Sequence, residues 1–196
     1  MHRTMFDTPV IKTIFRWISL IWLKLAGWKI EGEIPKDMKK CVMIAAPHTS
    51  NWDLPYTLFI AFAFRAPIYW MGKEQIFKPP FRGIMMWMGG VPVDRSKSTN
   101  MVQASADQIK EADQMYLIVP PEGTRSKVSK WKTGFYHIAQ TAEVPILLGF
   151  LDFERKRGGF LGTFDATGNV DEDIPKIQSR YAHIKGKKVD QFDAKK

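Results

Sequence analysis

A histidine and an aspartate within residues 47–53 have the side chains that general-base chemistry requires. His48 and Asp53 are five positions apart, which places them about 140° apart on one helix and on opposite faces of one strand. They can meet only if a turn lies between them. The sequence supplies that turn, because an apolar run ends at Pro47 and residues 49–51 are all of types that cap helices. We therefore expect Asp53 in the first turn of a helix, with His48 just outside it.

Such a pair could deprotonate an alcohol, or a water in a hydrolase. A carboxylate that accepts a hydrogen bond from Nδ1 fixes the tautomer of the imidazole, leaves Nε2 free as a base, and stabilises the imidazolium that forms. The spacing equally fits an aspartate that caps a helix beside a surface histidine. A metal site would need more ligands, and His2, His137 and His183 have no ligand-like spacing to His48. No metal is therefore expected.

A second segment, Pro-Glu-Gly-Thr-Arg-Ser at 121–126, follows another apolar run. Gly123 permits a positive φ or a close approach of the backbone to a ligand. Arg125 presents a planar fork that suits phosphate, and Glu122 could accept from a substrate hydroxyl or hold Arg125 in place. Arg95 also follows a short apolar run, so the two arginines could converge on one phosphate. The alternative is that both form surface ion pairs.

Alternating apolar runs and helical patterns predict the elements that position these residues. We expect a single α/β domain with a mixed, largely parallel sheet flanked by helices. The glycine-rich stretch from Gly158 suggests a hairpin, and Ile174, Ile177, Tyr181 and Ile184 indicate a last amphipathic helix. The expected strands are 41–46, 67–71, 91–93, 115–119 and 145–150, and the expected helices are 9–28, 54–65, 74–77, 81–88, 99–112 and 133–142.

The predicted helix at 9–28 has an unusually wide apolar face. Thr8 can cap it and Pro9 suits its first turn. Its polar side chains, Lys12, Thr13, Arg16, Ser19 and Lys24, fall within an arc of about 140°. The three cations make it a poor membrane span, and no small-residue cleavage site marks a signal peptide. We expect residues 1–27 to form an amphipathic helix at a membrane interface; the alternative is packing on the core of the domain.

The composition favours anionic partners but does not identify which kind of anion is bound. The 196 residues carry a formal net charge of +9, which suits nucleic acid, anionic lipid or acidic cofactors. The basic residues are dispersed, apart from a denser C-terminal group, and no nucleic-acid motif is present, so no nucleic-acid partner is expected. Seven Trp, thirteen Phe and ten Met fit a membrane interface or an ordinary core. The single Cys41 excludes an intrachain disulfide.

Taken together, these segments resemble the glycerophospholipid acyltransferase family over roughly residues 28–150. Four blocks occur in the order of the family: the His48-x4-Asp53 pair with Ser50 between, residues 90–95, residues 122–126, and Val-Pro-Ile at 144–146. The resemblance implies that His48 is the base on an acceptor hydroxyl and Asp53 its orienting group. It further implies an acyltransferase domain at 28–196. The residues it implies for binding the phosphate of the acceptor are Arg95, Glu122, Gly123, Thr124 and Arg125.

The resemblance also implies the substrates. The acyl donor would be a fatty acyl thioester, either acyl-CoA or acyl carrier protein, and no separate cofactor would be needed. The acceptor would be a lysophospholipid such as 1-acyl-glycerol-3-phosphate, attacking directly without an acyl-enzyme. The protein would be a peripheral or monotopic membrane protein on the cytoplasmic face. Two alternatives remain open: a non-catalytic module that binds anionic lipid or nucleic acid, and a thioesterase that uses the same His–Asp pair on water.

Overall fold

The computed structural model describes residues 3–93, 98–128 and 130–191 of the chain. Within these residues, seven strands form one sheet in the order β1-β7-β6-β2-β5-β3-β4. Neighbouring strands are parallel except for the antiparallel pair β6–β7. The α/β fold with a mixed, largely parallel sheet is therefore confirmed. The strands are β1 (Lys29–Glu31), β2 (Lys40–Ala46), β3 (Ile68–Lys73), β4 (Gly90–Val93), β5 (Met115–Ile118), β6 (Ile146–Asp152) and β7 (Arg157–Phe164).

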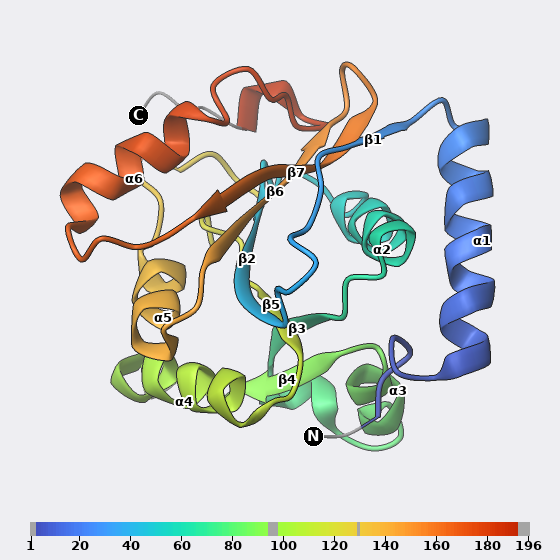
Figure 1. Cartoon of the computed structure of the whole chain (residues 1–196), viewed down its shortest axis with the longest axis horizontal. Coiled ribbons are helices and arrows are strands. Elements are labelled where there is room, and N and C mark those ends of the chain that lie inside the picture. Colours follow the sequence, from blue (N-terminus) through green and yellow to red (C-terminus); the bar gives the residue numbers. More distant parts are fainter. Residues whose placement is uncertain (1–2, 94–97, 129, 192–196) are drawn as a thin grey trace.

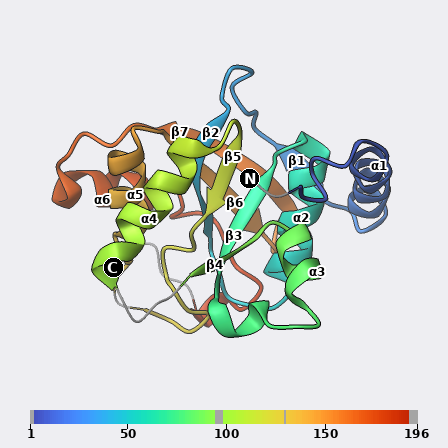
Figure 2. The ribbon, with the colours of Figure 1, turned by 90° about the horizontal axis from the view of Figure 1, so that it is seen from below.

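The helices form a layer on each face of this sheet. α2 and α3 cover one face, with α1 outside α2, whereas α4, α5 and α6 lie on the opposite side (Figure 1, and Figure 2 from below). The helices are α1 (Pro9–Leu25), α2 (Asp53–Phe64), α3 (Arg82–Trp87), α4 (Ser98–Glu111), α5 (Gly134–Ala142) and α6 (Val170–Ser179), with short 3₁₀ helices η1 (Glu74–Phe77) and η2 (Val189–Gln191).

From Cys41 onward the central strand β2 is apolar, because it is covered on both faces. Val42 and Ile44 are buried in the core beneath α4, α5 and α6. Cys41 and Met43 are buried in the core on the side of α2. Both faces of β2 are thus fixed by packing, and the turn that follows its carboxyl end starts from a rigid support.

Several sequence expectations need correction. Thr8 occupies the N-cap position of α1, but its hydroxyl donates to the carbonyl of Thr4 (2.9 Å) instead of capping. The last helix ends at Ser179, and Tyr181 and Ile184 are buried beyond its end. Gly158 lies inside β7, because the turn of the predicted hairpin comes before it. Finally, β1 was not expected.

The helix α1 packs against α2 through its more polar side. Ser19 and Leu23 are buried, and Nε of Arg16 donates to the carbonyl of Ala63 on α2 (3.3 Å). The opposite side carries exposed apolar residues along the whole helix: Val10, Ile14, Trp17, Ile18, Ile21, Trp22 and Leu25. We call this set the α1 apolar face. Among the described residues, no helix has the length and apolar character needed to cross a membrane.

Candidate active site

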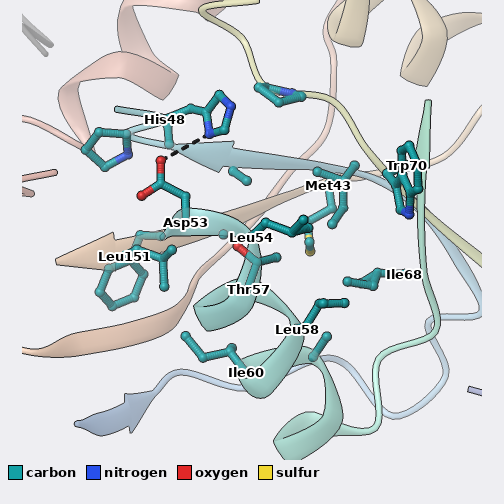
Figure 3. Close-up of a pocket in the computed structure, with 18 of the residues that line it drawn as sticks. Met43, His48, Asp53, Leu54, Thr57, Leu58, Ile60, Ile68, Trp70 and Leu151 are labelled. Carbon is teal, nitrogen blue, oxygen red and sulfur yellow. Dashed lines mark ion pairs between the residues drawn. The ribbon is translucent and has the colours of Figure 1, made fainter. Parts of the chain in front are cut away.

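The expected meeting of His48 and Asp53 occurs in the turn between β2 and α2. Asp53 is the first residue of α2, and Nδ1 of His48 lies 3.1 Å from its Oδ2 (Figure 3). The Asp53 side chain is 5% exposed, whereas that of His48 is 28% exposed. A carboxylate can only accept at this contact, so Nδ1 carries a proton, and in the neutral imidazole the lone pair is then on Nε2.

The Asp53 carboxylate also holds the turn that presents His48. Its Oδ2 accepts from the backbone N–H groups of Thr49 and Ser50, both at 2.8 Å. Its Oδ1 accepts from the Ser50 hydroxyl at 3.0 Å. The predicted caps were therefore wrong in detail, because the N-cap residue of α2 is Trp52, whose side chain makes no capping bond. Four hydrogen-bond donors fix Asp53, so the imidazole that it orients has little freedom to turn away.

Glu122, which follows β5, contacts the same turn through a hydrogen bond. β2 and β5 are parallel neighbours, so the segments after their carboxyl ends meet at one edge of the sheet. There, Oε1 of Glu122 accepts from the backbone N–H of His48 at 3.0 Å, and the residue is only 3% exposed. Burial raises the pKa of this carboxyl from 4.5 to about 7, and the nearby Asp53 charge adds to the rise while hydrogen bonds from the backbone oppose it. Glu122 therefore contacts the histidine turn, a role that neither sequence interpretation of this residue included.

An apolar cavity of about 390 Å³ opens beside His48 and Asp53 on the α2 side of the sheet. Side chains of α2 line it from Leu54 through Thr57 to Ala61, which corresponds to a length of about 10 Å at the helical rise. Ile68 and Trp70 of β3 form the facing wall (Figure 3). A cavity with such a lining suits a hydrocarbon chain whose reacting end lies at the histidine.

A second, polar cleft of about 640 Å³ is also lined by this turn. Its lining combines residues 49–52 with Arg125 and Ser126 from the segment after β5, and with Lys187 and Lys188 from the C-terminal part of the chain. The turn that carries the His–Asp pair thus lines both an apolar cavity, through Pro47, His48 and Asp53, and a basic cleft, through residues 49–52.

The structure describes three of the four other residues that were expected to bind the phosphate of the acceptor. Gly123 has the predicted positive φ of 65°, and a Cβ there would lie 2.9 Å from the Lys132 side chain. Thr124 lies on the same turn, where its hydroxyl accepts from the N–H of Ser126 (3.3 Å). Arg125 lines the basic cleft. Arg95 lies outside the described residues, so the convergence of two arginines stays a prediction.

Sequence reasoning missed Lys187 and Lys188 as members of this site. Their only signal was the density of lysines near the C-terminus, which is equally typical of a solvated tail. Among the described residues, no group of three His, Cys, Asp or Glu side chains is arranged to hold a metal ion.

The arrangement can perform base-assisted acyl chemistry. Nε2 of His48 faces neither the carboxylate nor the backbone contacts of its turn, so it can take a proton from a hydroxyl placed at the boundary between the two pockets. An acyl chain in the apolar cavity and an anionic group in the basic cleft would bring their reacting ends to that boundary.

Comparison with known proteins identifies the family. The crystal structure of a 1-acyl-sn-glycerophosphate (LPA) acyltransferase, PlsC, from Thermotoga maritima superposes with a TM-score of 0.59 at 21% sequence identity, covering 83% of this chain and 72% of that one. This similarity shows a shared fold. No curated protein sequence matches the chain significantly. The model of the acyltransferase family matches residues 27–147, more than half of the chain. The resemblance drawn from the four sequence blocks is thereby confirmed, and the chain belongs to the acyltransferase family.

Proposed function

We propose that this acyltransferase moves a fatty acyl group from a thioester donor to the hydroxyl of a lysophospholipid such as 1-acyl-glycerol-3-phosphate. The donor would be acyl-CoA or acyl carrier protein, and it is a substrate, so no further cofactor is invoked. The observation that carries the proposal is the position of the His48–Asp53 pair, at the end of an apolar cavity and next to a basic cleft.

In the proposed reaction, Nε2 of His48 takes the proton of the acceptor hydroxyl while its oxygen attacks the thioester carbonyl. A C–O bond forms, and the tetrahedral intermediate then collapses with cleavage of the C–S bond. The leaving thiolate takes its proton from the imidazolium, which Asp53 stabilises through Nδ1. Arg125 would hold the phosphate of the acceptor, since its guanidinium lines the basic cleft.

The assay for this function is thiol release from palmitoyl-CoA or palmitoyl carrier protein, with and without lysophosphatidic acid. His48→Ala should lower acceptor-dependent release by about 10²–10⁴-fold, because a general base contributes about that factor. His137→Ala is the matched control, since His137 is an exposed histidine on α5. Circular dichroism of both variants would establish that the fold is retained.

Three outcomes separate the alternatives. Acceptor-dependent release that is lost only in His48→Ala supports the proposal. Release that needs no acceptor would identify a thioesterase. Absence of release with either donor would argue against catalysis on these substrates and favour a lipid-binding protein.

We further propose that the protein associates peripherally with the membrane through α1. Its apolar face is exposed along the whole helix, whereas the polar side is the one packed on α2. Trp22 near the end of α1 lies against Phe59 in the middle of α2 (5.9 Å between ring centroids). Trp28, just after α1, stacks on Tyr56 in the first turn of α2 (4.2 Å between ring centroids), so the chain that follows α1 reaches the end of α2 at which the His–Asp pair lies. Insertion of this face would place the site close to lipid.

The charge of the protein supports the cytoplasmic face as the proposed location. A net charge of +9 is attracted by the anionic surface of that leaflet. The apolar face and the positive charge would therefore act together at the same membrane surface.

Flotation with phosphatidylglycerol-containing vesicles tests this association. Replacing Trp17 and Ile21 by Gln should weaken binding about tenfold for each side chain, because half or more of each is exposed on the apolar face. Thr13→Gln, at an exposed polar position of the same helix, is the control. Equal flotation of all three proteins would rule out insertion of α1.

A further inference from the structure

The chain returns to the active site after its last helix. Tyr181 and Ile184 are buried in the core beneath α4, α5 and α6. The backbone N–H of Phe153, just after β6, donates to the carbonyl of Lys185 at 2.9 Å. β6 is parallel to β2, so its carboxyl end lies at the same edge of the sheet as His48. These contacts dock the segment 181–188, which we call the docking segment, beside the histidine turn.

Gly186 allows the docking segment to lie directly against that turn. A Cβ at this position would come within 2.6 Å of the Thr49 hydroxyl oxygen and 3.2 Å of Cβ of Pro47. The next contact follows two residues later, where the backbone N–H of Lys188 donates to the same hydroxyl at 3.2 Å. The backbone of the docking segment is therefore in contact with residues on either side of His48.

Lys187 and Lys188 of the docking segment are exposed and line the basic cleft. Nζ of Lys187 lies 4.9 Å from the ring centroid of Trp52 and 5.6 Å from that of Phe153. These rings attract the ammonium group and limit where it can go. The backbone N–H of Lys188 is tied to Thr49, and the residue lines the cleft next to Lys187.

The charged side chains that line the basic cleft are all cations. Lys187 and Lys188 face the cleft that Arg125 also lines, and the described lining contains no acidic side chain. Like charges brought together repel one another, and a multiply charged anion relieves that repulsion. A guanidinium and two ammonium groups are the side chains that bind phosphate in proteins.

We propose that Lys187 and Lys188 are substrate-binding residues that hold a phosphate group opposite Arg125. They lie outside residues 27–147, the part of the chain that matches the family model. This inference rests on the proposed function for the identity of the substrates. It adds that the side of the cleft formed by Lys187 and Lys188 binds phosphate. The phosphate comes either from the lysophospholipid acceptor or from the nucleotide and pantetheine part of the donor.

The first test compares kinetics of the wild type with Lys187→Met/Lys188→Met. Methionine keeps the length of the side chain and its contact with the rings while it removes the charge. Lys185→Met is the control, because Lys185 pairs with Glu154 (2.7 Å) and does not line the cleft. We expect KM for one substrate to rise about tenfold or more in the double variant, with kcat nearly unchanged, because each exposed cation contributes about threefold to tenfold.

The second test measures binding without catalysis. Phosphorus NMR would follow the line width of glycerol 3-phosphate and, separately, of adenosine 3′,5′-bisphosphate on addition of protein. Loss of broadening in the double variant for the first probe assigns the acceptor, and loss for the second assigns the donor. If broadening by both probes and both KM values match those of the wild type, the inference is overturned.

The two proposals fail in different ways. A wild-type protein that transfers no acyl group, yet broadens a phosphate probe through Lys187 and Lys188, would refute the proposed reaction and keep the anion site. A protein that transfers acyl groups equally well with and without the two lysines would do the opposite.

Discussion

The buried carboxyl of Glu122 should make the stability of this protein fall as the pH rises toward neutrality. Its pKa is 4.5 when exposed and about 7 in the folded protein, chiefly because burial disfavours the charge. Below pH 4.5 the carboxyl is protonated in both states and has no effect on stability. Between the two values the unfolded chain ionises while the folded one stays protonated, so the equilibrium shifts toward the unfolded chain.

The perturbation that exposes this effect is Glu122→Gln. The amide keeps an oxygen that can accept from the N–H of His48, and it never ionises. At about 1.4 kcal/mol for each pKa unit, the rise from 4.5 to about 7 corresponds to about 3 kcal/mol. The variant should therefore gain up to about 3 kcal/mol over the wild type as the pH rises from 4 to 8.

Urea unfolding followed by tryptophan fluorescence, repeated at several pH values between 4 and 8, measures this difference. Taking the difference between the two proteins at each pH cancels the titrations that they share. Glu33→Gln, which removes a carboxyl from an exposed loop, is the control. A difference for Glu122→Gln that stays constant or falls with increasing pH would refute our account of the buried carboxyl.

Three further predictions concern the cavity, the core and the docking segment. Ala61→Phe, in the lining of the apolar cavity, should shift the preferred donor toward shorter acyl chains in a series of acyl-CoA substrates; an unchanged preference would mean that the chain lies elsewhere. Tyr136→Phe should lower the free energy of unfolding by about 1–3 kcal/mol, because it removes the hydroxyl that donates to fully buried Asp173 at 2.8 Å; urea unfolding would show this, and a loss under 0.3 kcal/mol would contradict it. Gly186→Ala should destabilise the protein by about 1–3 kcal/mol and raise the KM that depends on Lys187 and Lys188, since its Cβ would collide with Thr49; thermal unfolding and kinetics equal to wild type would count against the docking geometry.

The elements with strong apolar patterns could be predicted from the sequence, whereas weakly patterned ones could not. The runs that became β2 and β6 are buried along nearly their whole length, so their composition alone indicated strands. β1 has three residues with exposed and half-exposed side chains, and it forms only because β7 offers a parallel partner. Tyr181 was expected on the last amphipathic helix, but it is buried beyond the end of α6, in a place that depends on contacts with distant residues.

The residues of the candidate site likewise differ in how far the sequence predicts their contacts. His48 and Asp53 are close in sequence, so a turn between two recognisable elements was enough to predict their contact. Glu122 is 74 positions from His48, and its bond to the histidine backbone follows from the pairing of β2 with β5. Lys187 lines the cleft only because the chain returns to this edge of the sheet after β7 and α6. No local sequence pattern predicts that return.

The bond between Lys188 and Thr49 spans 139 positions of the chain, and this separation sets an order of events during synthesis. At about 5–20 residues per second, the ribosome needs on the order of 10 s to add the intervening residues. The histidine turn leaves the ribosome well before the docking segment exists, and closing a loop of this size also carries an entropic cost. Each newly made chain therefore passes through an interval in which His48 is present without the side of the cleft that Lys187 and Lys188 form.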